Sequence, residues 1–247
     1  GVLYNKDKTE LIQYPIGNSR TSFKIPDSVT TIGNLAFISC YSLTSVTIPD
    51  SVTTIELAAF EDCDSLTSVT IPDSVTTIGY DLFSGCSSLE TLTIGSGIKE
   101  IPESYFSGHG ALKTVNLSEG VEKIGNYAFS GCTNLTSVTI PDGVKTIGNY
   151  AFSGCTYLET INIPDSVKFI GSEVFNTDKL TCDETVDGLI YIGDILVDDI
   201  SKSLAACFRS KGKTGLADTL EALDVAAKIR TATGFSSGEI QRDLTLR

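Results

Sequence analysis

Five of the seven cysteines recur at one position of a repeating pattern, so they are the first side chains to consider for chemistry. These five are Cys40, Cys63, Cys86, Cys132 and Cys155. One interpretation is a ladder of disulfides or bound metal ions, but metal sites usually contain closely spaced CxxC pairs, and this sequence has none. The other interpretation is a column of buried free thiols that pack as small apolar side chains. The lack of CxxC pairs favours buried thiols, so we expect neither a metal site nor a cofactor.

The single histidine, His109, takes the place of a cysteine in this register, between Cys86 and Cys132. A Cys–His pair acts as a nucleophile only in a cleft and with a third group that orients the histidine. The flanking residues Gly108 and Gly110 have no side chain for that purpose. A Ser-His-Asp triad would have to be built on the same histidine. We therefore expect a chain that is not an enzyme.

A second register is acidic and follows a proline or small residue in most repeats. Its members are Asp27, Asp50, Asp73, Glu119, Asp142 and Asp165. If the repeats stack, these carboxylates lie about 4.8 Å apart, and calcium, which prefers oxygen ligands, is one possible occupant. The alternative is that Asp and the neighbouring Ser accept local backbone hydrogen bonds in a turn and remain solvated. We favour the turn.

These registers exist because the chain repeats every 23 residues without insertion or deletion. The unit begins at an isoleucine or leucine seven times, at Ile25, Ile48, Ile71, Ile94, Leu117, Ile140 and Ile163. A fixed period of this length is typical of a solenoid, in which each unit buries its apolar edge only against its neighbours. We call each unit a rung and number the rungs from Ile25.

Within the third rung and its approach, residues 66–71 follow an LxxLxL pattern that predicts a short strand with one buried face. Pro72 ends that strand, and residues 75–78 are predicted to form a second extended segment. Leu82 and Phe83 are expected in a short helical or 3₁₀ turn that leads to the next strand. One phenylalanine per rung shares a register and predicts a continuous aromatic spine: Phe37, Phe60, Phe83, Phe106, Phe129, Phe152 and Phe175.

The sequence divides into three parts. Residues 1–24 lie outside the repeat frame and contain two β-prone runs around a polar turn, so they predict a hairpin that caps the first rung. Residues 25–185 hold the seven rungs, of which the fourth and seventh depart from the pattern. In the fourth, Gly95 replaces proline, Pro102 replaces glycine and His109 replaces cysteine. Residues 186–247 predict either a second hairpin with a degenerate closing repeat or a separate helical cap.

Charge limits the partners. The chain has 18 Lys and Arg against 31 Asp and Glu, a net charge of −13, which disfavours nucleic acid and anionic membranes. No apolar run in the sequence is long enough to insert into a membrane, and we expect a secreted, extracellular or cell-surface protein whose signal peptide is absent from this fragment. Because the sequence has no methionine at all, we expect a processed or excised fragment. We expect it to be monomeric.

The repeated motif IPDSVTTIG..AF..C..LTSVTIP resembles that of the BspA-like leucine-rich repeat family, and the opening GVLYNKDKTELIQYP resembles that family's flanking segment. The resemblance covers residues 1 to about 180. It implies a leucine-rich repeat solenoid, a β-rich α/β horseshoe of parallel strands capped by β-hairpin segments. It also implies a bacterial or protozoal protein at the cell surface, in a family of which several members adhere to host matrix proteins or other cells.

The strand residues between the buried positions predict a polar binding face on the concave sheet. Three columns contain the candidate ligand-binding residues: Ser45, Ser68, Thr91, Thr114, Ser137 and Thr160; Thr47, Thr70, Thr93, Asn116, Thr139 and Asn162; and Glu90, Lys113 and Glu159. We expect a non-catalytic adhesion module whose partners are extracellular-matrix or cell-surface proteins. One alternative is a structural spacer that displays another module. Another is the targeting domain of a surface hydrolase, whose catalytic part only the tail could contain.

Overall fold

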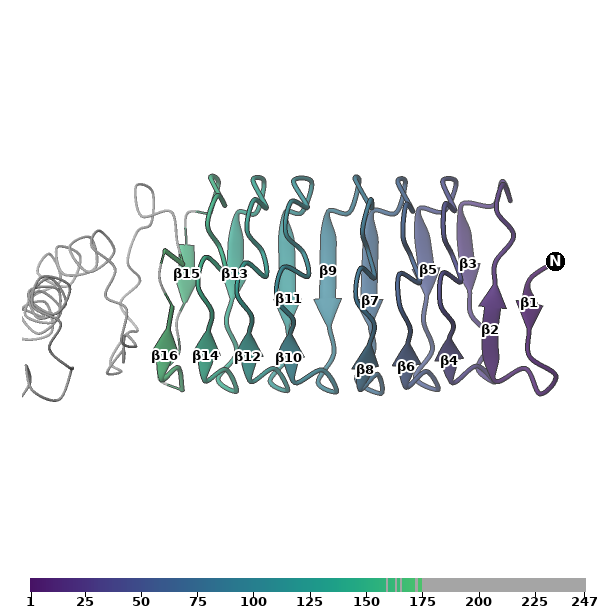
Figure 1. The fold of residues 1–247 in the computed structure, drawn as a ribbon, viewed down its shortest axis with the longest axis horizontal. Coiled ribbons are helices and arrows are strands. Elements are labelled where there is room, and N and C mark those ends of the chain that lie inside the picture. Colours follow the sequence, from purple (N-terminus) through teal and green to yellow (C-terminus); the bar gives the residue numbers. More distant parts are fainter. Residues whose placement is uncertain (159, 163, 165, 172, 175–247) are drawn as a thin grey trace, which may run out of the picture.

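The computed structural model shows a solenoid of stacked rungs. Each rung contributes one strand to a long sheet, named the front sheet, and one to an opposite row, named the back, which faces the viewer in Figure 1. The structure describes residues 1–158, 160–162, 164, 166–171 and 173–174. Neighbouring strands within each row of rungs are parallel and in register, so residues one period apart stack on each other. The predicted leucine-rich repeat solenoid is confirmed.

The front sheet has seven strands and is continuous from the first rung to the last one described. Its strands are β3 (Ser22–Lys24), β5 (Ser45–Thr47), β7 (Ser68–Ile71), β9 (Thr91–Ile94), β11 (Thr114–Leu117), β13 (Ser137–Thr139) and β15 (Thr160–Asn162). Side chains alternate between the two faces of a strand, so Val69 and Ile71 enter the core while Ser68 and Thr70 face outward.

The back row consists of two-residue strands, apart from the four-residue β2 near the N-terminus. One sheet contains β1 (Leu3–Tyr4), β2 (Glu10–Gln13), β4 (Thr31–Ile32), β6 (Thr54–Ile55) and β8 (Thr77–Ile78). The other contains β10 (Glu100–Ile101), β12 (Lys123–Ile124), β14 (Thr146–Ile147) and β16 (Phe169–Ile170). No strand pairing joins β8 to β10, so the back row is divided between the third and fourth rungs, where the front sheet is not.

The helical turn expected around Leu82 and Phe83 is wrong, because the described residues contain no helix. Isolated turns occupy this segment instead, such as the one closed by the Ser84 amide, which donates to the Asp81 carbonyl at 3.0 Å. Asp81 has a φ of 56°, in the left-handed region, which interrupts helical continuation. In most rungs the amides of this segment point along the stack, as where the Phe60 N–H donates to the Leu82 carbonyl at 3.0 Å.

The N-terminal hairpin is present. Strands β1 and β2 pair antiparallel, and β2 then pairs in parallel with β4, so the hairpin extends the back sheet beyond the first rung. Asn5 shapes its turn, because its side-chain oxygen accepts the Thr9 amide at 2.9 Å. Leu11 and Tyr14 are almost fully buried against the stack. The second hairpin or helical cap predicted for 186–247 lies outside the described residues.

The phenylalanine spine is continuous over the described rungs. The rings of Phe37, Phe60, Phe83, Phe106, Phe129 and Phe152 are fully buried and stack on one another, with centroids 4.9–6.1 Å apart. Such ring pairs contribute about 0.5–1.5 kcal/mol each beyond the burial of their area. The widest separation, 6.1 Å, is between Phe83 and Phe106, which flank the division of the back row. Phe175 lies outside the described residues.

Candidate binding face

The register of the front sheet places the predicted columns as the sequence spacing required. Ser68, Thr91 and Thr114 are Cα partners in neighbouring strands, and Ser45 and Ser137 continue that column on either side. Thr70, Thr93 and Asn116 are likewise aligned, with Thr47 and Thr139 beyond them. Thr160 and Asn162 pair with Ser137 and Thr139 through β15. Glu159 lies outside the described residues.

Alternation along each strand makes this face polar. In β7, β9 and β11 the central residues Val69, Leu92 and Val115 are buried, whereas the Ser, Thr and Asn residues beside them are exposed or half-buried. None of the aligned column positions holds an aromatic side chain. The face therefore offers hydroxyl and amide groups in regular rows.

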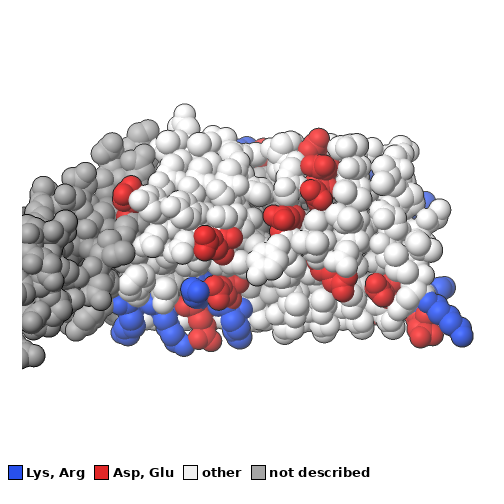
Figure 2. Space-filling model, in the orientation of Figure 1, with Lys and Arg blue, Asp and Glu red and all other residues white. Residues whose placement is uncertain are grey.

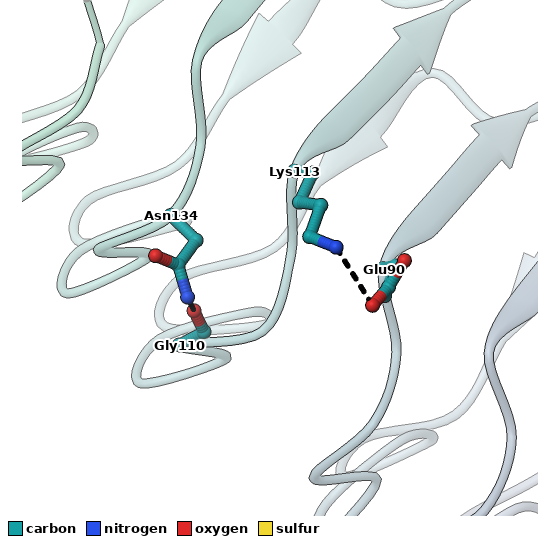
Figure 3. A network of polar contacts seen from close by, with 4 residues as sticks. All are labelled: Glu90, Gly110, Lys113 and Asn134. Atoms are coloured by element: carbon teal, nitrogen blue, oxygen red, sulfur yellow. Dashed lines mark hydrogen bonds and ion pairs between the residues drawn. The ribbon is translucent and has the colours of Figure 1, made fainter.

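A salt bridge between Lys24 of β3 and Asp27, at 3.5 Å, lies at the first strand of the sheet, and the third column contains another charged contact. Lys113 donates to the Glu90 carboxylate at 2.8 Å across one rung boundary (Figure 3). Both side chains are about half exposed, and such pairs stabilise a fold by about 0–1 kcal/mol. The pair breaks a column of threonines in which the Thr67 hydroxyl donates to the Thr44 carbonyl at 3.2 Å.

Other side-chain contacts fix the polar groups in place. The Asn116 amide donates to the Thr93 hydroxyl at 3.3 Å, and at the neighbouring edge the Asn134 amide donates to the Gly110 carbonyl at 2.7 Å (Figure 3). These bonds run between successive rungs and hold the side chains along the axis of the stack. The face therefore presents hydroxyl and amide groups that are held in rows along the stack.

The cysteines are free, buried thiols in the described rungs, as the second interpretation predicted. Each of Cys63, Cys86, Cys132 and Cys155 donates its S–H to the carbonyl of the spine phenylalanine one rung earlier, at 3.1–3.2 Å. Burial raises the pKa of the Cys155 thiol to about 12, so it stays protonated and unreactive at neutral pH.

His109 occupies the same position in the fourth rung, and its Nε2 lies 2.9 Å from the Phe83 carbonyl oxygen. Its ring packs edge-on against Phe106. The histidine therefore substitutes structurally for a thiol. One GxSxG sequence, GFSSG at residues 234–238, is the kind of motif that can hold a serine nucleophile, and it lies outside the described residues.

The acidic register lies at exposed turns, as Asp27, Asp50, Asp73, Glu119 and Asp142 show. Asp73 accepts the backbone N–H of Ser96 at 2.7 Å, and this hydrogen bond lowers the pKa of its carboxyl. Within the described residues no group of three or more His, Cys, Asp or Glu side chains is placed to hold a metal ion. Asp165 lies outside them.

The uneven distribution of charge along the array was not predicted from the sequence. Residues 25–98 contain nine acidic side chains and no lysine or arginine, and the array's lysines begin at Lys99. On the back, Lys123 pairs with Glu100 and Lys145 with Glu122, and Figure 2 shows these charges together at the lower edge of the later rungs. The sequence could have shown these ion pairs, since the two residues of each pair are one 23-residue period apart and carry opposite charges.

Within the described segments no helix is long and apolar enough to cross a bilayer.

Comparisons with known proteins agree with this architecture. The model of the BspA type leucine rich repeat region matches six copies, over residues 17–136 and 99–201. A leucine-rich repeat protein from Eubacterium ventriosum is 35% identical with a TM-score of 0.69, over 76% of this chain and 50% of its own length. The T. pallidum leucine rich repeat protein is 27% identical with a TM-score of 0.61, over 87% of this chain and 92% of its own. A search of curated proteins found no match.

The chain thus spans half the length of the first of these relatives and nearly all of the second. The repeat-family match covers well over half of the chain and coincides with the stacked rungs. This chain belongs to the BspA-type leucine-rich repeat family.

Proposed function

We propose that this chain is a non-catalytic protein-binding module at the cell surface, which presents its front sheet to extracellular-matrix or cell-surface proteins. The observation that carries the proposal is the continuous seven-stranded front sheet with its aligned rows of exposed hydroxyl and amide groups. Membership of the BspA-type family supports the surface location. Extended sheets of solenoids commonly serve as binding surfaces.

Individual binding events on this face should be weak. Hot spots at protein interfaces are enriched in Trp, Tyr and Arg, and the column positions of the front sheet have none of these. Attachment then depends on many copies acting together, because tethering raises the effective concentration for each further contact.

A structural spacer is the second candidate, and the uniformity of the rungs favours it. Over residues 44–47 and 67–70 the front strand repeats the same sequence, TSVT, so these rungs present nearly the same surface. A hydrolase-targeting role would need a catalytic part in residues 186–247, which lie outside the described rungs.

The test is capture of a panel of purified extracellular-matrix proteins on a densely coated surface. The front variant changes Thr93, Asn116 and Thr139 to Lys, which adds three charges to one exposed column. The control changes Thr30, Thr53 and Thr76 to Lys. These three exposed residues form a column directly before the back strands β4, β6 and β8. Both variants alter net charge equally, so only the position differs.

We expect the front variant to lose capture and the control to retain it. Retained capture by the front variant with loss in the control would assign binding to the back. Absence of capture by the unmodified chain, on every protein of the panel, would favour the spacer.

A further inference from the structure

The interface between the third and fourth rungs lacks the hydrogen bonds that join the other rungs at the back. Elsewhere the amide that follows a back strand donates to the isoleucine carbonyl of the preceding rung, as from Gly79 to Ile55, Gly125 to Ile101 and Gly148 to Ile124, each at 2.8 Å. In the fourth rung this position is Pro102, which has no N–H. In the second rung Glu56 also stands in place of glycine, but its N–H still donates to the Ile32 carbonyl. Pro102 differs from the other residues in this register because it has no N–H to donate.

The turn segments are separated at the same interface. The amides of Ser104, Phe106 and Gly108 donate to the fifth rung at 2.8–2.9 Å. Their counterparts one rung earlier, Asp81, Phe83 and Gly85, make no such bond to the fourth rung. At this interface, neither the back strands nor the turns that follow them form backbone hydrogen bonds between the third and fourth rungs.

Two side chains at this interface are larger than their counterparts in the other described rungs. Tyr105 stands in a register held by Ala36, Ala59, Leu82, Ala128, Ala151 and Val174. Its hydroxyl donates to the Gly79 carbonyl at 2.6 Å across the interface. Burial raises the pKa of Tyr105, which keeps that hydroxyl protonated. His109 reaches the Phe83 carbonyl in place of a shorter cysteine. These side chains bridge a wider separation, which Figure 1 shows between β8 and β10.

Two further observations locate the same boundary. Ile78 is partly exposed, whereas Ile55 and Ile101 in the same register are fully buried. The front sheet, by contrast, is intact: β9 pairs in full register with both β7 and β11. The two parts of the array are joined as a sheet only along the front.

We propose that this interface is a hinge: the rungs before residue 91 and those after residue 94 form two blocks that bend about β9, with the back opening and closing. Bending about β9 changes the curvature of the front face between Thr70 and Asn116 and so its fit to a broad partner. The hinge itself does not depend on the proposed binding function, and its test uses no ligand.

Hydrogen exchange measures the opening directly. In the unmodified chain we expect the amides of Asp81, Phe83 and Gly85 to exchange at least about tenfold faster than those of Ser104, Phe106 and Gly108, which hold the equivalent positions in a closed interface. A repaired variant, with Pro102→Gly, Tyr105→Ala and His109→Cys, restores the residues of the neighbouring rungs. It should bring the two sets to similar rates. Equal rates in the unmodified chain would overturn the proposal.

A transferred variant places the same three residues at the next interface, as Gly125→Pro, Ala128→Tyr and Cys132→His. We expect fast exchange to appear at Ser104, Phe106 and Gly108, which now face the substituted rung. The repaired variant moves toward the repeat pattern, so it tests the proposal even where the transferred one does not fold. Slow exchange in a folded transferred variant would show that these residues do not cause the opening.

Bending is measured by the distance distribution between two spin labels at exposed back positions three rungs apart. Labels at Thr53→Cys and Glu122→Cys span the interface, and labels at Lys99→Cys and Lys168→Cys span the same number of rungs within one block. Both pairs are built with Cys182→Ser and Cys207→Ser, and the five array cysteines are buried. We expect a broader distribution for the first pair that narrows in the repaired variant. Equal widths would mean that the interface is open but rigid.

Discussion

Replacing Phe129 with alanine should destabilise the array more than any surface change of the same size. Phe129 is fully buried, and its ring lies 5.3 Å from both Phe106 and Phe152. A Phe→Ala change in a core costs about 3–5 kcal/mol. Loss of two stacked contacts adds about 1–3 kcal/mol at roughly 0.5–1.5 each. A Phe129→Leu variant keeps most of the apolar volume and should lose mainly the ring contacts.

Tyr127 provides the matched control, because its ring stacks on Tyr150 at 4.8 Å but is 40% exposed. Tyr127→Ala should cost less than about 1.5 kcal/mol. The assay is urea unfolding followed by far-UV circular dichroism, since the chain has no tryptophan. If Phe129→Ala falls within about 1 kcal/mol of Tyr127→Ala, the rings do not form a stabilising spine.

Three further outcomes are expected. Thiol titration without reductant should find few reactive groups in the folded chain and seven after denaturation, because the array thiols are buried; a count near zero after denaturation would mean disulfides. Asp73→Ala should lower stability at neutral pH, because the Ser96 N–H lowers the folded-state pKa of Asp73. That difference should disappear as the pH falls through the lowered pKa, and a pH-independent difference would refute its electrostatic origin. Lys113→Ala should cost at most about 1 kcal/mol, with a smaller effect at high salt, because the pair with Glu90 is exposed.

Periodicity was sufficient to predict most of the fold. A rung buries its apolar side chains only when residues one period apart stack, so the repeat in the sequence also gives the strand register, the phenylalanine spine and the polar columns. The N-terminal hairpin followed from residues that leave the frame and yet contain strand patterns. The binding role of the columns remains a prediction.

Two features of the fold became clear only in the structure. A short helical turn was expected around Leu82 and Phe83, but their backbone groups lie in isolated turns. In other rungs the amides of the equivalent turns donate along the stack, and a single sequence does not show which partner an amide takes. The open interface was marked in the sequence by Pro102 and His109, both visible departures from the pattern. Tyr105 was overlooked, although comparison with the alanines of its register would have identified it.

The open interface also bears on how a nearly uniform array distinguishes partners. Identical rungs present identical groups, so they contribute affinity to any partner with matching hydrogen-bonding groups and little discrimination. Discrimination must come from rungs that differ. On the front face, the departures from serine and threonine among the described columns are the Glu90–Lys113 pair, Asn116, Asn162 and, at the first strand, Lys24. Glu90, Lys113 and Asn116 lie on or beside β9 and β11, where the two proposed blocks join, whereas Lys24 and Asn162 lie in β3 and β15. If the interface is the proposed hinge, the only distinctive charge pair between neighbouring rungs of the described columns lies where the curvature of the face changes.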